Sequence, residues 1–199
     1  MRSLSATPRL FNLKEYYTMR RAGIFGQDRV ELLEGMVVKM TPADLLHDGA
    51  ILKSTVLLVK LFSDTHQVGC QLGLYMGEKT ELLPDFFLAR HQHHSECLKR
   101  RRKPNCPDLV IEVSHSSLRY DTREKPSLYA RNAIPEYWVL DVRKRCLLIH
   151  TSPSEDAAGF VGMGYARVSR HGENDWVCAA FAPDVKIRVG DLLGPPLAD

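Results

Sequence analysis

The sequence lacks any long apolar run and any strong excess of one charge. No stretch approaches the roughly 20 consecutive apolar residues that span a bilayer, since the most apolar segment, residues 50–62, is interrupted by Lys53 and Lys60. A membrane-spanning protein is therefore excluded. The 27 Lys and Arg residues nearly balance 24 Asp and Glu residues, and the net charge of +3 is too small to indicate a nucleic-acid-binding protein by itself.

Several short motifs are also missing. The five cysteines are odd in number and form no Cys-x-x-Cys pair, which argues against a disulfide-stapled secreted module and for a cytoplasmic protein. The N-terminus has no continuous apolar segment and is expected to be mature chain rather than a signal peptide. There is no Gly-rich phosphate loop, no Gly-x-Ser-x-Gly and no His-Glu-x-x-His, so nucleotide kinases, serine hydrolases and zincins have no motif support.

What is present fits one domain over residues 1–199, because no repeat or low-complexity linker divides the chain. Residues 12–23 predict a short helix, and residues 29–40 predict a hairpin that turns at Glu34-Gly35. A helix capped by Thr41 is expected over residues 42–62. Strand-like segments dominate the rest, interrupted by a helix near residues 125–133. The fold class is therefore α/β (α+β), a mixed sheet with a few helices and additional β-hairpins.

Two carboxylates in strand-like segments stand out. Residues 107–114 alternate so that Leu109, Ile111 and Val113 share one face and Glu112 lies on the other. Asp85 is the better partner for Glu112 if their strands are neighbours, because adjacent strands lie only about 5 Å apart. Asp108, four residues before Glu112 on the same strand, is about 13 Å away and is not a co-ligand.

Asp85 and Glu112, followed by Lys125, suggest metal-assisted hydrolysis of a phosphodiester. Two carboxylates with water suit Mg²⁺ or Mn²⁺, and a nearby ammonium can orient the water that attacks a phosphodiester. On spacing alone, the same acids also fit ordinary strand ends that are solvated or cap turns.

The order of several segments resembles a known family. These segments are residues 30–35, Thr41-Pro42 with His47, Pro84-Asp85, residues 107–113, Asp121 with Lys125 and Tyr129, and residues 136–141. Together they resemble the Uma2 (Uma-two) family of restriction endonucleases, a branch of the PD-(D/E)xK superfamily, and the resemblance covers nearly the whole chain.

The resemblance implies a restriction-endonuclease-like mixed β-sheet flanked by helices, with Asp85 as the first acid and Glu112 as the second. The lysine that usually follows the glutamate by two residues is replaced by Ser114, and Lys125 is the expected substitute. Glu31 would be a further ligand or hold the water, although it also fits a surface strand residue. His47 would contact a phosphate, although a lone helix histidine more often packs or is solvated.

The turn after the catalytic strand departs from the family pattern, because Ser114-His115-Ser116-Ser117 replaces Leu-Ser-Pro-Ser. His115 is thereby a further candidate for the site. We expect the next helix to start at Lys125 with Pro126 in its first turn, rather than at a capping box beginning at Asp121. Lys125 would then lie near the positive end of that helix.

A run of five cations separates the two carboxylate strands, namely Lys99, Arg100, Arg101, Arg102 and Lys103. It suits contact with a phosphate backbone and equally suits a solvated loop. His91, His93, His94, Cys97 and Cys106 in the same region have no zinc-finger or zinc-ribbon spacing.

The leading hypothesis is a Mg²⁺- or Mn²⁺-dependent endonuclease acting on DNA, with Asp85 and Glu112 on the metal, Lys125 positioning the water and Glu31 assisting. The alternatives are a catalytically weak or inactive DNA-binding relative of the same fold, and an interaction protein without a nucleic-acid role. A homodimer is expected if both strands of a duplex are cut together.

Overall fold

The structure is a computed structural model that describes residues 7–42, 44–91 and 107–194. Its centre is a six-stranded sheet in the order β10-β9-β8-β7-β6-β3. Its strands are β3 (His66–Cys70), β6 (Phe86–Arg90), β7 (Pro107–Ser114), β8 (Glu136–Asp141), β9 (Cys146–Glu155) and β10 (Met163–Gly172). Only β7 and β8 pair in parallel, so the sheet is mixed.

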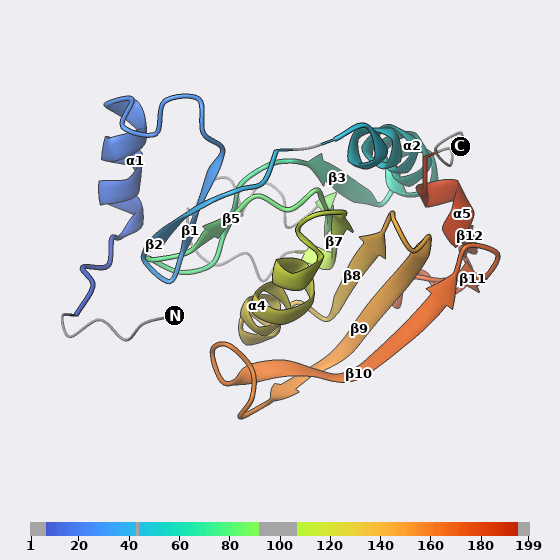
Figure 1. Ribbon diagram of the computed structural model, residues 1–199. Helices are drawn as coiled ribbons and strands as arrows, with labels where there is room; N and C mark the ends of the chain where they lie inside the picture. The colour runs from blue at the N-terminus through green and yellow to red at the C-terminus, as the bar shows by residue number, and fades with distance from the viewer. Residues whose placement is uncertain (1–6, 43, 92–106, 195–199) are drawn as a thin grey trace.

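A smaller sheet and short elements complete the fold (Figure 1). The four-stranded sheet has the order β2-β1-β5-β4, formed by β1 (Val30–Leu33), β2 (Met36–Lys39), β4 (Leu74–Tyr75) and β5 (Glu81–Leu82). Near the C-terminus β11 (Trp176–Val177) pairs with β12 (Ile187–Arg188), followed by α5 (Val189–Leu192). Helix α1 (Leu13–Arg21) begins with a capping box between Asn12 and Glu15.

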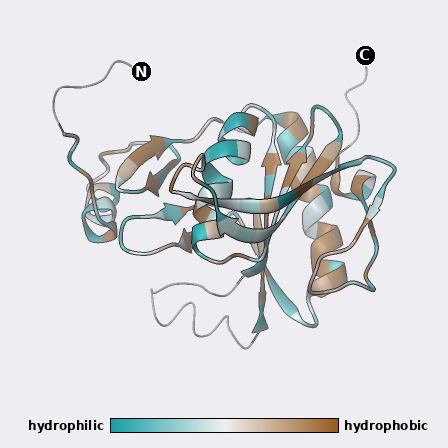
Figure 2. Cartoon of the chain, turned by 90° about the horizontal axis from the view of Figure 1, so that it is seen from below, coloured by the Kyte–Doolittle hydropathy of each residue, from teal (hydrophilic) through white to brown (hydrophobic). Residues whose placement is uncertain are grey.

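Two helices cover opposite faces of the large sheet. Helix α2 (Leu45–Phe62) packs Leu58 and Phe62 into a core with Ile111 of β7. Helix α4 (Leu118–Arg131) connects the parallel strands β7 and β8 and packs Tyr129 against Val110. The central strands carry the brown of apolar residues (Figure 2). The alternation predicted for residues 107–114 is thus confirmed, because odd and even positions enter different cores.

The predicted start of α2 is wrong by three residues. Its N-cap is Asp44, whose Oδ1 accepts hydrogen bonds from the backbone N–H groups of Leu46 and His47. An aspartate satisfies these otherwise unpaired donors as well as a threonine does, so Thr41-Pro42 precedes the helix. The correction matters because Asp44 and His47 both lie at the site described below.

The predicted start of α4 is also wrong. The helix begins at Leu118, seven residues before Lys125, and Pro126 lies inside it. Pro126 has no N–H to donate to Thr122, but the helix is retained because its buried face, including Tyr129, is packed on the sheet. Lys125 therefore lies in the middle of the helix and not at its positive end.

Two of the strand-like segments are each divided between the two sheets. Residues 68–77 form the end of β3 and then β4, and residues 82–90 form the end of β5 and then β6. Asp85 lies where the chain passes from the small sheet into the large one. The hairpin of β1 and β2 turns at Glu34 and Gly35, which both have positive φ, as expected.

Candidate active site

The site is built around the junction of β6 and β7. These strands are antiparallel neighbours, and Phe86 pairs with Ile111. Continuing this register by one residue places Asp85 opposite Glu112, with both side chains on the same side of the sheet. The condition under which Asp85 is the partner of Glu112 is met, because Asp85 directly precedes β6 and β6 is a neighbour of β7.

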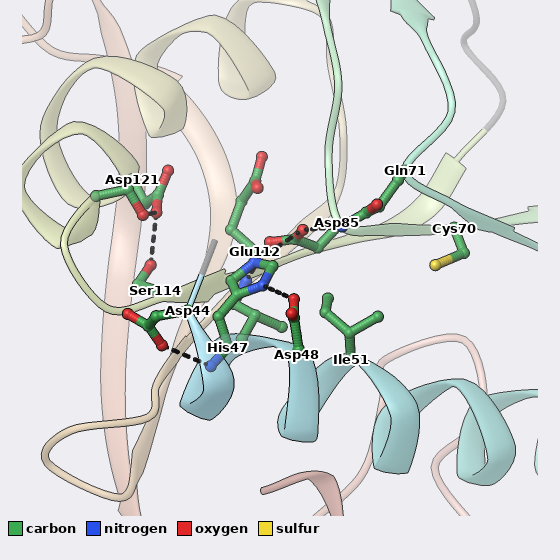
Figure 3. Close-up of polar contacts among 12 residues, drawn as sticks. Asp44, His47, Asp48, Ile51, Cys70, Gln71, Asp85, Glu112, Ser114 and Asp121 are labelled. Atoms are coloured by element: carbon green, nitrogen blue, oxygen red, sulfur yellow. Dashed lines mark hydrogen bonds and ion pairs between the residues drawn. The ribbon is translucent and has the colours of Figure 1, made fainter. Parts of the chain in front are cut away.

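Asp85 is fixed by contacts from β7, from α2 and from the residue after β3. Its Oδ2 accepts a hydrogen bond from the N–H of Val113 at 2.8 Å, and its Oδ1 accepts a long one from the Gln71 amide at 3.4 Å. Nε2 of His47, on α2, lies 3.2 Å from the same Oδ1. Figure 3 shows the His47 ring beside Asp85 and Glu112. Burial opposes the charged imidazole, but the hydrogen bond and charge of Asp85 raise the pKa of His47.

Glu112 is held by two residues of α4. Its Oε1 accepts hydrogen bonds from Nζ of Lys125 and from the hydroxyl of Tyr129, both at 2.7 Å. Its Oε2 accepts no hydrogen bond from the part of the chain that the structure describes. Glu112 and Asp85 both line one pocket.

Lys125 is enclosed by carboxylates. Its Nζ lies 2.7 Å from Glu112, 3.4 Å from Asp121 and 3.7 Å from Glu31, and its side chain is 2% exposed. Burial disfavours the ammonium, but the charges of Glu112, Glu31 and Asp121 hold the pKa of Lys125 well above its ordinary value. Lys125 is therefore a fixed cation and hydrogen-bond donor, not a general base.

Glu31 lies behind this lysine. Its Oε1 accepts the N–H of Leu83 at 2.7 Å, its Oε2 accepts the hydroxyl of Tyr120 at 3.0 Å, and it is fully buried. Glu31 is not among the residues that line the pocket. The structure thus joins Glu31 to the site through Lys125 rather than through direct exposure to the pocket.

Sequence reasoning gave Asp121 no role, yet the structure places it at the centre of the site. Its Oδ2 accepts hydrogen bonds from the hydroxyls of Ser114 and Ser117 at 2.6 and 2.5 Å, while its Oδ1 faces Lys125. The feature of the sequence that could have identified Asp121 is its spacing of four residues from Lys125, which is in turn four from Tyr129, because residues four apart lie on one face of a helix. That face of α4 carries all three side chains toward Glu112.

The pocket itself has a volume of about 380 Å³. Oδ2 of Asp44, the cap of α2, lies 2.5 Å from Nδ1 of His115, and this contact links α2 to the turn after β7 at the pocket wall. The expectation that His115 enters the site is confirmed in this form. Three cations that sequence reasoning missed also line the pocket, Arg29, Lys39 and Arg119.

Other expected residues lie elsewhere. Asp108, rejected as a co-ligand, contacts His66 at 3.1 Å and Arg90 at 3.3 Å, at the opposite end of β7 from Ser114. The cation run from Lys99 to Lys103 lies outside the described residues, as do His93, His94, Cys97 and Cys106. Within the described ranges, no group of three or more His, Cys, Asp or Glu side chains is arranged to hold a metal.

A mixed sheet with helices on both faces and a buried Asp, Glu and Lys at one strand junction is the arrangement of a restriction-endonuclease-like protein. Residues 13–189 match the model of the Uma2 family, which is described as "Putative restriction endonuclease". The chain belongs to the Uma2 family. The resemblance seen in the sequence is thereby confirmed.

One solved structure supports the fold, and a second is a partial match over part of the chain. A crystal structure of "a putative nuclease belonging to DUF820 from Anabaena variabilis ATCC 29413" matches with a TM-score of 0.62 and 13% identity, over 83% of this chain and 90% of that chain. The type IIG restriction endonuclease BpuSI matches with a TM-score of 0.35 and 16% identity, over 53% of this chain and 11% of that chain. No curated protein matches significantly. No helix of the described residues is both long and apolar enough to cross a membrane.

Proposed function

We propose that this protein is a Mg²⁺- or Mn²⁺-dependent endonuclease that hydrolyses DNA phosphodiester bonds. The observation that carries the proposal is the pairing of Asp85 and Glu112 across adjacent strands, with Lys125 Nζ 2.7 Å from Glu112, in one pocket. Family membership and the shared fold support nuclease chemistry in general. We propose one domain over residues 1–199 and a cytoplasmic location, which the odd, scattered cysteines favour.

The side chains of the pocket fit an open Mg²⁺ site, in which water and substrate complete the shell, better than a site in which protein ligands fill every position. Mg²⁺ is commonly held by one or two carboxylates, with water and substrate phosphate completing the shell. Asp85 and Glu112 supply two carboxylates, and the free Oε2 of Glu112 supplies an oxygen without a competing donor among the described residues. When bound, the metal would act as a Lewis acid on the phosphate and lower the pKa of a bound water.

The remaining residues have distinct roles in this proposal. Lys125 donates hydrogen bonds to the attacking water and to the charge that develops on the phosphate. Because it remains an ammonium, the proton of the water leaves to solvent or to the departing oxygen and not to Lys125. Glu31 assists by holding Lys125 from behind, and His47 orients Asp85 and contacts a phosphate oxygen.

The charges at the pocket favour a polyanionic substrate. Arg29 and Arg119 are exposed, and neither forms an ion pair with any side chain in the described part of the chain. Cations at this position would neutralise DNA phosphates next to the bond that is cut, so binding should weaken as salt rises. The run from Lys99 to Lys103 is a further candidate for such contacts.

The test is nicking of supercoiled plasmid in Mg²⁺ or Mn²⁺. We expect Asp85→Asn and Glu112→Gln to abolish nicking and Lys125→Met to slow it by on the order of 100-fold. Asp108→Asn is the matched control, because Asp108 is a second Pro-Asp aspartate on the same strand as Glu112 but faces His66. It should retain wild-type activity.

The result also decides against the alternative. A folded wild type that binds plasmid DNA in a salt-dependent way but never nicks it would make the protein an inactive DNA-binding relative, with the altered turn at Ser114–Ser117 the first place to look. Nicking that survives Glu112→Gln would overturn the assigned site. For cutting both strands together we propose a homodimer, since each strand needs its own active site.

A further inference from the structure

The outward face of α2 is apolar although the helix already has a buried face. Ala50, Leu58 and Phe62 are buried in the core with the sheet, and Ser54 is buried with its hydroxyl donating to the carbonyl of Leu192 in α5. On the opposite side the exposed fractions are 84% for Leu45, 70% for Leu52, 70% for Val56 and 43% for Val59. Scattered single apolar residues on a surface are ordinary, but four along one helical face form a patch that indicates an interaction surface.

The spacing of these residues is that of a coiled-coil seam. Leu45, Leu52 and Val59 are seven residues apart, and Val56 lies four after Leu52. This assigns Leu45, Leu52 and Val59 to heptad position d and Val56 to position a, while Gly49, the preceding residue at position a, lies against the backbone of Gly194 and adds no side chain to the seam. In a parallel arrangement, a β-branched residue at a with leucine at d favours two strands rather than three or four.

Charges flank the seam in a pattern that also selects an orientation. Asp48 is at position g, while Lys53 and Lys60 are at position e, so one edge of the seam is acidic and the other basic. In a parallel pair, position g of one helix meets position e of the other five residues later, which joins Asp48 to Lys53 of the partner subunit. An antiparallel pair would place the lysine edges against each other, which is repulsive.

We propose that this face of α2 binds a second copy of the chain, with the two α2 helices parallel about a two-fold axis. Asp44 and His47 are at the N-terminal end of α2, so this arrangement brings both pockets to the same end of the dimer. If each pocket cleaves DNA as proposed above, the parallel dimer presents two cleavage sites to one duplex; this consequence rests on the proposed function.

The dimer is tested first by mass, which needs no activity. Sedimentation equilibrium at up to about 100 µM should give twice 22.6 kDa for the full chain. Leu52→Lys should give a monomer, whereas Val168→Lys, at an exposed position on β10, should remain dimeric. A monomeric wild type, or a dimer that survives Leu52→Lys, would overturn the proposal and leave this face to another occupant.

Orientation is tested by cross-linking. Leu45→Cys should form a disulfide-linked dimer on mild oxidation, because each residue 45 meets its own copy in a parallel pair. An antiparallel pair about the helix centre would separate them by about 25 Å, far beyond the roughly 6 Å between the Cα atoms of a disulfide. Wild type, with its native cysteines, is the control and should give no such product.

A charge exchange adds an independent measurement. Asp48→Lys should raise the dimer dissociation constant several-fold, and adding Lys53→Asp to it should restore the wild-type value. No recovery in the double variant would contradict the parallel register.

In the plasmid assay Leu52→Lys should still nick while losing direct linearisation. If wild type cuts nothing, the nuclease proposal fails, whereas mass and cross-linking still decide the interface.

Discussion

His150 on β9 predicts a measurable pH dependence of stability. Its ring is buried beside Tyr137 and Tyr165, and its Nε2 has no hydrogen-bond partner among the residues that the structure describes. Burial lowers the pKa of His150 from 6.5 to about 4. In the unfolded chain the imidazole titrates near 6.5, so between these values the unfolded state binds a proton that the folded state refuses.

The sign and size follow from that difference. Stability from neutral His150 is fully present above pH 6.5 and is lost as pH falls toward 4, because proton binding favours unfolding. At 1.36 kcal/mol per pKa unit, the loss approaches about 3 kcal/mol. His150→Phe keeps an aromatic ring and removes the titrating group. At pH 8 we expect the variant to match wild type within about 1 kcal/mol.

The assay is urea unfolding of both proteins at pH 8, 6, 5 and 4.5. Other groups also titrate in this range, but they are common to both proteins, so the difference in unfolding free energy isolates His150. The variant should become progressively more stable than wild type as pH falls, with most of the change between pH 6 and 4.5. A difference that stays constant with pH would refute the assignment of His150 as a buried neutral imidazole.

Two further predictions concern the site. Asp121→Asn keeps an acceptor for Ser114 but removes a charge 3.4 Å from Lys125, so single-turnover cleavage should slow about tenfold with DNA affinity unchanged; loss of affinity alone would argue against this positioning role. Asp44→Ala removes the cap of α2 and the contact to His115, which should cost about 1 kcal/mol in thermal unfolding, and Asp44→Ser should recover most of it.

Local evidence in the sequence was sufficient to reject Asp108 as the partner of Glu112. Alternation in residues 107–114 identified the faces of β7, and the reach along one strand excluded Asp108. Which strand neighbours β7 is a long-range question that periodicity alone does not answer. The resemblance to Uma2 supplied that step, and the pairing of Phe86 with Ile111 confirms it.

The predicted starts of α2 and α4 were wrong because more than one local signal fits a helix start. Thr41 and Asp44 both suit an N-cap, and only the packed structure selects Asp44. Proline signals a helix start in local sequence, yet Pro126 is held within α4 because the face bearing Tyr129 is buried. In both cases tertiary packing outweighed a local preference.

The displacement of the lysine from the strand to α4 leads to a last prediction. Ser114 follows Glu112 by two residues on β7, so their side chains share one side of the strand. The hydroxyl of Ser114 and the Nζ of Lys125 both contact Asp121, so a lysine at position 114 would reach the same carboxylates once Lys125 is removed. We expect Lys125→Ala with Ser114→Lys to recover part of the nicking that Lys125→Ala loses. Ser114→Ala with Lys125→Ala, the matched control, should recover none. The lysine-bearing double variant could instead fold, bind DNA and cut no better than this control. The reaction would then require a lysine at position 125 of α4, and an ammonium placed among these carboxylates from β7 would not be enough.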